Sequence, residues 1–538
     1  MGIIASSEFI EDFLNLDYIY IDKTEFIYNI ITNYKKVFLS SPRRFGKSLT
    51  LNIIGTLFSK GVNPYFKNTW IYDKWKYPPY PVLKLNFLDF PTDDLDEFKR
   101  QICNYIKDIA DLWKLDNFIS DKEPSVCIQK FLKTLSDDRQ VVILIDEYDC
   151  QLTANINKPE KYENFRNCIR NFYAVLKGEK HIRFMAVTGV TRLKDVSIFS
   201  VGSDITDLTY NHAYAQITGF TEEEIKKYYI DQLKLGISYD RNKDINEVTD
   251  DEIDELIRQM ACHYDGYCFD KLYTSKVFST FSVNTFLKSI NENKQLVFDN
   301  YWYESGGLPA ILRNYVQSHD IDINVLLESK INIGYNDFIN PSSLVDMNIN
   351  VLLCQTGYLT LKSQIINNQD VTLGLTNLEI ANSLCALISL KLFKENVTPQ
   401  SLNKEFIMEK GSVAEIVNLF NSILHAVSYD KYPINNESVL RAIIQVYLLG
   451  KNTDVNTEHH NSKGRCDLIV NFKNRRVIVE FKYTESEQDE HNLLKKTEEQ
   501  IKNKAYGLEY PDKKEIMRIA CVFNGSRNKR MISSYSEV

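Results

Sequence analysis

The ten cysteines of this 538-residue chain contain no C-x-x-C pair, so their spacing gives no sign of a paired-cysteine site. Several of them, such as Cys103, Cys354 and Cys385, lie in apolar runs, and we interpret them as buried free thiols of a reducing compartment. The sequence also lacks a signal-peptide pattern and any apolar run long enough to cross a bilayer. We therefore expect a cytoplasmic protein with no membrane partner.

An excess of positive charge is also missing. The chain has 64 Lys and Arg against 72 Asp and Glu, which gives a formal net charge of −8. This balance excludes a chain-wide attraction for nucleic acid, so any contact with DNA has to be local. The hydrophobic fraction of 44% and the charged fraction of 25% are typical of a soluble globular protein. The length predicts roughly three or four domains.

One stretch has the pattern of a phosphate-binding loop. After an apolar strand that begins at Lys36, residues 41–48 read S-P-R-R-F-G-K-S, the P-loop pattern with Ser in place of its first Gly. Such a loop lets backbone N–H groups converge on phosphates at a helix N-terminus. We expect Lys47 to reach the β- and γ-phosphates and Ser48 to hold Mg²⁺. The alternative is a chance match in a strand-to-helix turn, which the apolar helical face over residues 54–58 argues against.

A second element that fits a nucleotide site lies downstream. Residues 141–149 read V-V-I-L-I-D-E-Y-D, and five consecutive aliphatic residues predict a strand buried on both faces of a parallel sheet. Acids that follow such a strand beside a P-loop handle Mg²⁺ and the attacking water. We assign Asp146 to the metal through water and Glu147 to polarising the water. A solvated turn explains one acid, but not three within four residues.

Five segments together resemble a known family. Y-I-D-K-T at 20–24, the P-loop, I-D-E-Y-D at 145–149, V-T-G-V-T-R-L at 187–193 and G-F-T-E-E-E at 219–224 look like the AAA-ATPase-like family, in the right order. Its members typically carry a PD-(D/E)XK nuclease-like domain at the C-terminus, and their loops generally read T-R-P-R-R-F-G-K-[ST]. The resemblance implies ATP and Mg²⁺ as cofactors. The candidate nucleotide-binding residues are Ser41, Arg44, Phe45, Gly46, Lys47, Ser48, Leu49, Asp146 and Thr188.

Two further polar residues follow the strand expected over residues 183–189. Thr188 lies where many P-loop ATPases place a sensor of the γ-phosphate. Arg192, just beyond, is a candidate phosphate contact, in cis or across a subunit boundary, and a structural arginine is the equal alternative. Asp22 and Lys23, in the segment before the first strand, are weaker candidates, for which a surface salt bridge is preferred.

The alternation of strands and helices predicts an α/β fold with a mostly parallel P-loop NTPase sheet covered on both faces. We place this AAA-ATPase-like domain at residues 1–220, a helical lid region at 221–330, a connecting module at 331–380, and a second α/β, restriction-endonuclease-like domain at 381–538. Thr221 and Glu224 form a capping box at the start of the lid. In the connecting module, residues 351–361 predict strands around a turn at Thr356-Gly357.

The C-terminal part contains a second group of candidate residues. Two strands, 464–470 and 477–482, place Asp467 across a hairpin from Glu480 and Lys482, which share one face of their strand. This arrangement resembles the PD-(D/E)XK nuclease core, in which two carboxylates hold Mg²⁺ and the lysine orients or deprotonates a water. A cross-strand salt bridge on an exposed sheet face is the alternative. The resemblance adds Glu437, at a helix start, and Gln500 in a later helix.

These observations predict an ATP-binding and hydrolysing protein that controls a Mg²⁺-dependent nuclease-like domain. The partner is nucleic acid, with DNA preferred, and local positive charge comes from the helix around Gln500 and from R-N-K-R at 527–530. A homo-oligomer is compatible with the sequence. The alternative is a nucleotide-dependent switch or scaffold whose C-terminal fold binds DNA or protein without cleaving it, because a fold does not guarantee an activity. A C-terminal fold that is purely structural is a third possibility.

Overall fold

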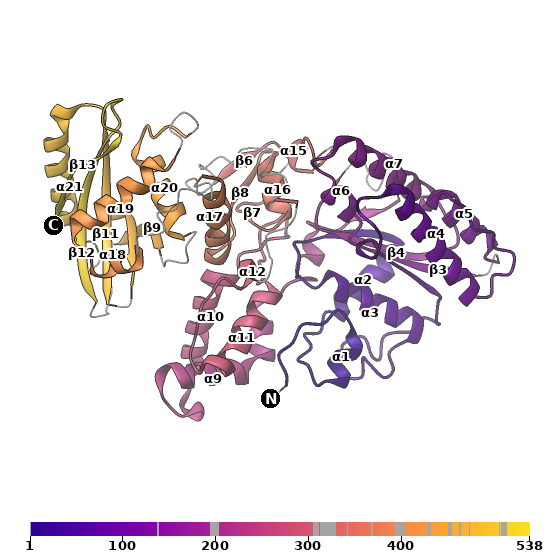
Figure 1. The fold of residues 1–538 in the computed structure, drawn as a ribbon. Coiled ribbons are helices and arrows are strands. Elements are labelled where there is room, and N and C mark those ends of the chain that lie inside the picture. The colour runs from indigo at the N-terminus through magenta and orange to yellow at the C-terminus, as the bar shows by residue number, and fades with distance from the viewer. Residues whose placement is uncertain are drawn as a thin grey trace. The chain divides into compact units, whose positions relative to one another are not determined.

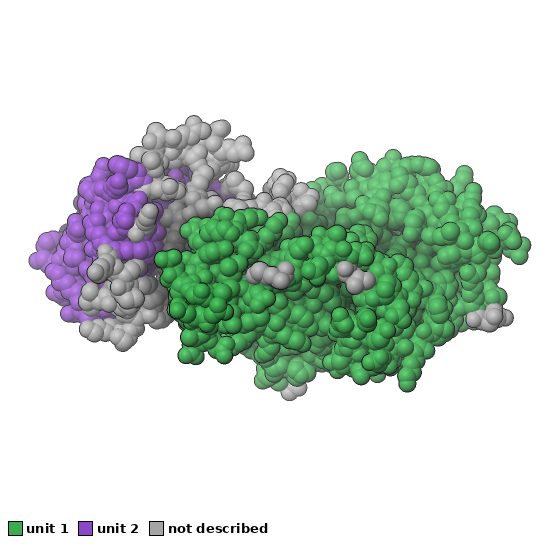
Figure 2. All heavy atoms as spheres, turned by 90° about the horizontal axis from the view of Figure 1, so that it is seen from below, with its two compact units in different colours: residues 1–320, 330–380 green, residues 321–329, 381–538 purple. Residues whose placement is uncertain are grey.

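The structure is a computed structural model. It describes residues 2–136, 139–193, 204–304, 311–312, 330–339, 341, 343–366, 369–392, 404–427, 432–449, 455–461, 464–472, 474–504, 506 and 514–538. The chain divides into two compact units, residues 1–320 with 330–380 (unit 1) and residues 321–329 with 381–538 (unit 2), coloured separately in Figure 2. Among the helices of the described part, none combines the length and the apolar character needed to span a membrane.

Unit 1 contains the predicted parallel sheet. Its five strands run in the order β2-β3-β4-β1-β5, and each neighbouring pair is parallel. The strands are β1 (Lys36–Ser40), β2 (Val82–Asn86), β3 (Val141–Asp146), β4 (Ile182–Gly189) and β5 (Thr206–Asp207). Because the strands are parallel, the end of β1 that leads into the P-loop lies at the same edge of the sheet as the acidic end of β3. Only β4 lies between these two strands.

Helices cover both faces of this sheet, as predicted. Figure 1 shows α2 (Thr24–Asn33) and α3 (Lys47–Lys60) on one side, and α4 (Leu95–Leu112), α5 (Pro124–Thr134) and α7 (Pro159–Leu176) on the other. Alternate residues of β1, β3 and β4 face α2 and α3, as period-2 geometry requires, and they form one apolar cluster with those helices. The shorter elements are α1 (Ile10–Asn15), η1 (Phe87–Asp89) and α6 (Cys150–Ala154).

A helical region follows the sheet in unit 1. It consists of η3 (His212–Tyr214), α8 (Glu222–Tyr228), α9 (Ile230–Arg241), η4 (Ile245–Glu247), α10 (Asp250–Tyr264), α11 (Thr280–Asn293) and α12 (Tyr301–Glu304). The capping box predicted at the start of α8 is confirmed, because Thr221 and Glu224 exchange both of its hydrogen bonds. The apolar faces of α8 to α11 form a separate core, to which the N-terminal residues Ile4 and Ile21 also contribute.

The segment between the helical region and unit 2 contains a small antiparallel sheet of order β6-β8-β7. Its elements are β6 (Ile331–Ile333), α15 (Tyr335–Ile339), α16 (Ile349–Gln355), β7 (Leu359–Leu361) and β8 (Val371–Leu375). The predicted strand before Thr356 is wrong, because residues 349–355 form a helix that Asn348 caps. A short, continuously buried apolar run has no periodicity that separates a helix from a strand. The predicted turn is present, with Gly357 at φ +90°.

Unit 2 has its own mixed sheet, so the predicted α/β layout of two separate sheets is confirmed. The strand order is β13-β12-β11-β10-β9, in which only the β11–β12 pair is parallel. The strands are β9 (Val455–Asn461), β10 (Gly464–Asn471), β11 (Arg475–Thr484), β12 (Glu515–Asn524) and β13 (Met531–Glu537). The helices are α17 (Leu378–Leu392, which begins in unit 1), α18 (Lys404–Lys410), α19 (Val413–His425), α20 (Glu437–Leu449), η5 (Glu487–Asp489) and α21 (Glu490–Lys504).

Candidate functional site

The loop between β1 and α3 has the backbone shape that phosphate binding requires. Gly46 has φ +90°, and a Cβ at this position would meet nothing within 4 Å, so glycine is needed for the backbone angle and not for space. Lys47 is 4% exposed, and its Nζ donates hydrogen bonds to the carbonyl oxygens of Ser41 (2.8 Å) and Pro42 (2.9 Å). The ammonium group therefore lies against the loop, beside the N-terminus of α3.

Two features of this loop fit an anionic group. The first turn of α3 has no side-chain cap, so its backbone N–H groups remain available at the positive end of the helix dipole. In addition, the hydroxyl of Ser41 is buried and makes no hydrogen bond with any residue that the structure describes. Ser48 lies half-buried in the first turn of α3, where a hydroxyl belongs if it is to meet a cation on the phosphates. Leu49 is half-buried beside it.

The acidic end of β3 brings three of the predicted residues together. The carboxylate of Asp146 accepts a short hydrogen bond from the hydroxyl of Thr188, on neighbouring β4, and one of 3.0 Å from the backbone N–H of Glu147. Glu147, the next residue, has a backbone φ of +50°, which few residues other than glycine adopt. Burial raises the pKa of Glu147, and the positive charges of Lys47 and Arg43 oppose that effect. The carboxyl of Glu147 is therefore electrostatically coupled to the P-loop.

The third acid of this stretch has a structural role. Asp149 is 1% exposed, and its carboxylate accepts hydrogen bonds from the backbone N–H (2.7 Å) and the hydroxyl of Thr191. Arg192 is also engaged elsewhere, in an ion pair with Asp207 at the end of β5. These contacts tie the loop after β4 to the rest of the sheet, so they favour the structural alternative for Arg192.

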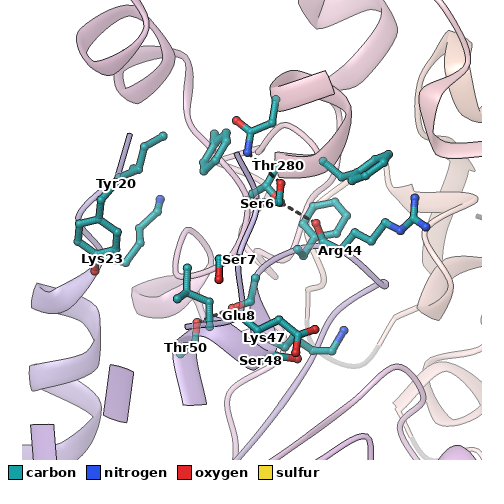
Figure 3. Close-up of a pocket in the computed structure, with 18 of the residues that line it drawn as sticks. Ser6, Ser7, Glu8, Tyr20, Lys23, Arg44, Lys47, Ser48, Thr50 and Thr280 are labelled. Atoms are coloured by element: carbon teal, nitrogen blue, oxygen red, sulfur yellow. Dashed lines mark hydrogen bonds between the residues drawn. The ribbon is translucent and has the colours of Figure 1, made fainter. Parts of the chain in front are cut away.

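A pocket of about 560 Å³ lies over the P-loop, within unit 1. Its walls are the loop and the first turn of α3, Glu147, the N-terminal segments 5–8 and 19–23, and the helical-region segments 217–220 and 280–284. Figure 3 shows side chains from these segments around the pocket, with Lys47 and Ser48 at the bottom of the view and Tyr20 and Lys23 at the left. Its size is in the range of small-molecule sites. The sequence contains no motif for segment 5–8, because these residues become part of the site only through folding.

Hydrogen bonds fix the pocket walls to one another. Asn284, on α11, donates to the carbonyl oxygen of Ala5 (3.4 Å) and to the hydroxyl of Ser6 (3.3 Å). Thr280, at the start of the same helix, donates to the carbonyl oxygen of Arg44 in the P-loop (2.6 Å). The guanidinium of Arg44 lies 4.2 Å from the ring centre of Phe281. The helical region therefore contacts both the P-loop and the N-terminal segment.

Phe45 anchors the P-loop to this region. Its side chain is 1% exposed, and its ring centre lies 4.7 Å from that of Tyr267, 5.5 Å from Phe269 and 6.1 Å from Trp302, all edge-on. Because the ring is occupied by this packing, only the backbone of Phe45 is left for a nucleotide. The sequence motif alone does not separate these two roles.

The second candidate site lies on β10 and β11 of unit 2. The antiparallel register pairs Leu468 with Val479, which puts Asp467 opposite Glu480. The backbone N–H of Asp467 donates to Glu480 Oε2 (3.4 Å), and Asp467 Oδ2 accepts from the backbone N–H of Phe481 (2.9 Å). The two carboxylates predicted to act together are therefore neighbours.

The other predicted residues surround this pair. Lys482 Nζ lies 3.7 Å from Glu480 Oε1 and 3.3 Å from Glu437 Oε2, at the start of α20. Gln500, on α21, donates a short hydrogen bond from Nε2 to Glu480 Oε1. All five residues of the sequence pattern, including both positions taken from the resemblance, are thus connected by direct contacts.

The carboxylate pair fits a hard cation. Glu480 is 2% exposed, and burial together with the charge of Asp467 raises its pKa to about 7. A divalent cation relieves this repulsion, and Mg²⁺ is commonly bound by one or two carboxylates with waters and phosphate oxygens supplying the rest. Within the described residues, no three His, Cys, Asp or Glu side chains come together as metal ligands. Asp467 and Glu480 would hold the metal without a third such side chain.

The structure adds one charged residue that the pattern did not identify. Arg441, on α20, is 4% exposed, and its Nη1 lies 3.9 Å from Asp467 Oδ1. The sequence does carry a signal for it, because a basic residue interrupts the apolar run of this helix four residues after Glu437. The predicted basic surface is partly neutralised, since Lys529 pairs with Glu487 (3.3 Å) and Glu490 (3.2 Å).

Comparisons with known proteins match the two parts of the chain that contain these candidate sites. Residues 4–199 match the AAA-ATPase-like family, described as a predicted AAA-ATPase, and residues 435–533 match a family of the PD-(D/E)XK nuclease superfamily. An uncharacterised protein from the vnfD 5′ region of Azotobacter chroococcum mcd 1 is 25% identical over 531 residues, which cover 96% of this chain and 95% of that protein. The chain therefore joins an AAA-ATPase-like domain to a PD-(D/E)XK nuclease superfamily domain.

Proposed function

We propose that the N-terminal domain binds ATP with Mg²⁺ and hydrolyses it. The observation that carries this proposal is the convergence of the P-loop, Asp146, Glu147 and Thr188 at one edge of a parallel sheet, beside a pocket of about 560 Å³. The β- and γ-phosphates would lie on the P-loop, with Lys47 beside them and Ser48 and Asp146 toward Mg²⁺. Glu147 would polarise the attacking water, and Thr188 would hold Asp146 in position.

The same proposal assigns the rest of the pocket to the nucleoside. Apolar side chains of segments 19–23 and 217–220 also line the pocket, and they suit the faces of a purine. Ser41, Arg44 to Gly46 and Leu49 complete the loop, and their backbone groups supply the phosphate contacts. Because segments 5–8 and 280–284 both line the pocket, bound nucleotide would contact the helical region as well as the sheet.

We further propose that nucleotide binding or hydrolysis controls the C-terminal domain, and that this domain cleaves nucleic acid, with DNA as the favoured substrate. Asp467 and Glu480 would hold Mg²⁺, which supplies the charge stabilisation that phosphodiester cleavage needs. Lys482 would orient or deprotonate the water. Gln500 and Glu437 keep Glu480 and Lys482 in place through the contacts described above. A cytoplasmic protein, active alone or as a homo-oligomer, fits this proposal.

The test is cleavage of supercoiled plasmid and of single-stranded DNA in Mg²⁺, with and without ATP, by wild-type protein and the variants Glu480→Gln and Glu147→Gln. We expect Glu480→Gln to abolish cleavage and to leave ATP hydrolysis unchanged. Glu147→Gln is expected to lower ATP hydrolysis by about 100-fold or more, the usual effect of losing a general base, and to remove the effect of ATP on cleavage. Matched controls are Glu499→Gln on α21 and Glu160→Gln on α7, which remove exposed carboxylates.

The outcomes separate the two halves of the proposal. Wild-type protein that hydrolyses ATP but cuts neither DNA would overturn the nuclease assignment and leave the nucleotide-dependent scaffold. Cleavage that depends on Glu480 but responds neither to ATP nor to Glu147→Gln would overturn the control of one domain by the other.

A further inference from the structure

A polar stripe runs along an otherwise apolar face of α20. Glu437, Arg441 and Gln445 follow one another at intervals of four residues, so they share one side of the helix. Arg441 and Gln445 are 4% and 8% exposed, and the helix contacts β9, β10 and β11. Burying an arginine on such a face is costly unless an opposite charge is near. The position of Arg441 therefore needs a physical explanation.

The charges of α20 complement those of the nuclease-like site. Glu437 meets Lys482 at 3.3 Å, and Arg441 faces Asp467 at 3.9 Å. Each carboxylate oxygen of Asp467 thus has a neighbour, since Oδ2 accepts from the backbone N–H of Phe481 (2.9 Å) and Oδ1 faces Arg441. The oxygen that a metal ion would take is the one beside the guanidinium.

From this geometry we propose that Arg441 is a positioning residue that competes with the metal ion for Asp467 and thereby sets the metal affinity of the site. This inference rests on the proposed metal-dependent function of the same site. In the metal-free protein, the guanidinium of Arg441 pairs with Asp467 Oδ1. In the metal-bound protein its charge repels the cation, and the guanidinium, with its fork of N–H donors, is left facing the phosphate of a bound nucleic acid.

The size of the effect follows from Coulomb's law. With a Mg–O distance of about 2.1 Å, a cation bound to Oδ1 lies at most about 6 Å from Arg441 Nη1. Repulsion between a unit charge and a divalent charge at that separation, screened as in water, corresponds to about a tenfold change in dissociation constant. Because Arg441 is buried, where screening is weaker, tenfold is the lower bound.

The experiment measures Mn²⁺ binding to the full-length protein without nucleotide, by calorimetry and by the electron paramagnetic resonance signal of free Mn²⁺. Arg441→Gln and Arg441→Met remove the charge, and methionine also suits a buried site if glutamine prevents folding. Arg441→Lys retains the charge. Arg476→Gln is the control, because Arg476 is 3% exposed and lies four residues before Glu480 on β11, about 13 Å along the strand.

We expect Arg441→Gln or Arg441→Met to tighten Mn²⁺ binding about tenfold or more. Arg441→Lys is expected to bind as the wild type does, and Arg476→Gln, whose charge is about 13 Å away, is expected to change binding by no more than about threefold. Unchanged or weaker binding by the neutral variants would overturn the inference, because an arginine that merely supports the fold cannot improve metal binding when it is lost. Asp467→Asn separates this failure from failure of the proposed function. If Asp467→Asn binds Mn²⁺ as tightly as the wild type, the metal is not at this site and both proposals fail.

Discussion

Replacing Phe45 by alanine is expected to destabilise unit 1 even without nucleotide. The ring is 1% exposed and touches three other aromatic rings with centre distances of 4.7, 5.5 and 6.1 Å. Truncating a buried phenylalanine to alanine costs about 3–5 kcal/mol, which includes ring pairs worth about 0.5–1.5 kcal/mol each. We therefore expect the free energy of unfolding of unit 1 to fall by about 4 kcal/mol.

Tryptophan fluorescence measures this change in unit 1 alone. The chain has four tryptophans, at positions 70, 75, 113 and 302, and all of them lie in unit 1. In a urea titration, a slope of about 3 kcal/mol/M converts the expected loss into a midpoint lower by about 1.3 M. The matched control is Phe9→Ala, because Phe9 is 57% exposed and its loss is expected to change stability by less than about 0.5 kcal/mol.

Measurements with and without ATP distinguish an anchoring role of Phe45 from a direct role in nucleotide binding. If Phe45 only anchors the loop, ATP still binds the folded variant and therefore still raises its free energy of unfolding. Part of the binding energy is then used to order the P-loop. A variant with an unchanged midpoint in the absence of nucleotide, and with weakened ATP binding, would refute the anchoring role. The ring would then contact the nucleotide directly.

Three further predictions concern single carboxyl groups in unit 1. Burial raises the pKa of Glu147, and we propose that its ionised form polarises the attacking water, so ATP hydrolysis should rise with pH above the ordinary carboxyl range and then level off. Phosphate release measured from about pH 5 to 8 checks this, and a flat profile would contradict it. Asp149→Asn should lower the stability of unit 1 by about 2–3 kcal/mol in urea titrations, through the loss of charge-assisted bonds to Thr191, with ATP affinity unchanged. Burial raises the pKa of Glu379 to about 8, so the folded state keeps a proton that the unfolded chain releases above about pH 4.5. The stability of unit 1 should therefore fall by a few kcal/mol as the pH rises from 4.5 to 8, and Glu379→Gln, measured in the same titrations, should flatten that dependence.

Local patterns were enough to predict the chemical groups and the strands that carry them. The S-P-R-R-F-G-K-S loop and the V-V-I-L-I-D-E strand each contain, within ten residues, the spacing that defines their structure. Parallel pairing then brings their ends to one edge, which follows from the fold class alone. In the same way, period-2 alternation predicts that Glu480 and Lys482 share one face of their strand. In the structure, Lys482 Nζ lies 3.7 Å from Glu480 Oε1.

Contacts between distant segments were beyond the reach of the sequence. The burial of Phe45 depends on Tyr267 and Trp302, more than 200 residues away. Segment 5–8 lines the pocket through contacts such as the hydrogen bonds from Asn284, which is also distant in the sequence. No local pattern encodes such pairings.

The sequence by itself predicts which residues bind phosphate and metal, because those predictions depend on residue type and short spacing. Only the tertiary structure decided which charges oppose one another, since electrostatic energy depends on distance in space. Asp149 is one of three acids within four residues, and only its contacts show that its carboxylate is bound to Thr191. Arg441 interrupts the apolar run of its helix, but only the fold shows that its guanidinium lies 3.9 Å from Asp467.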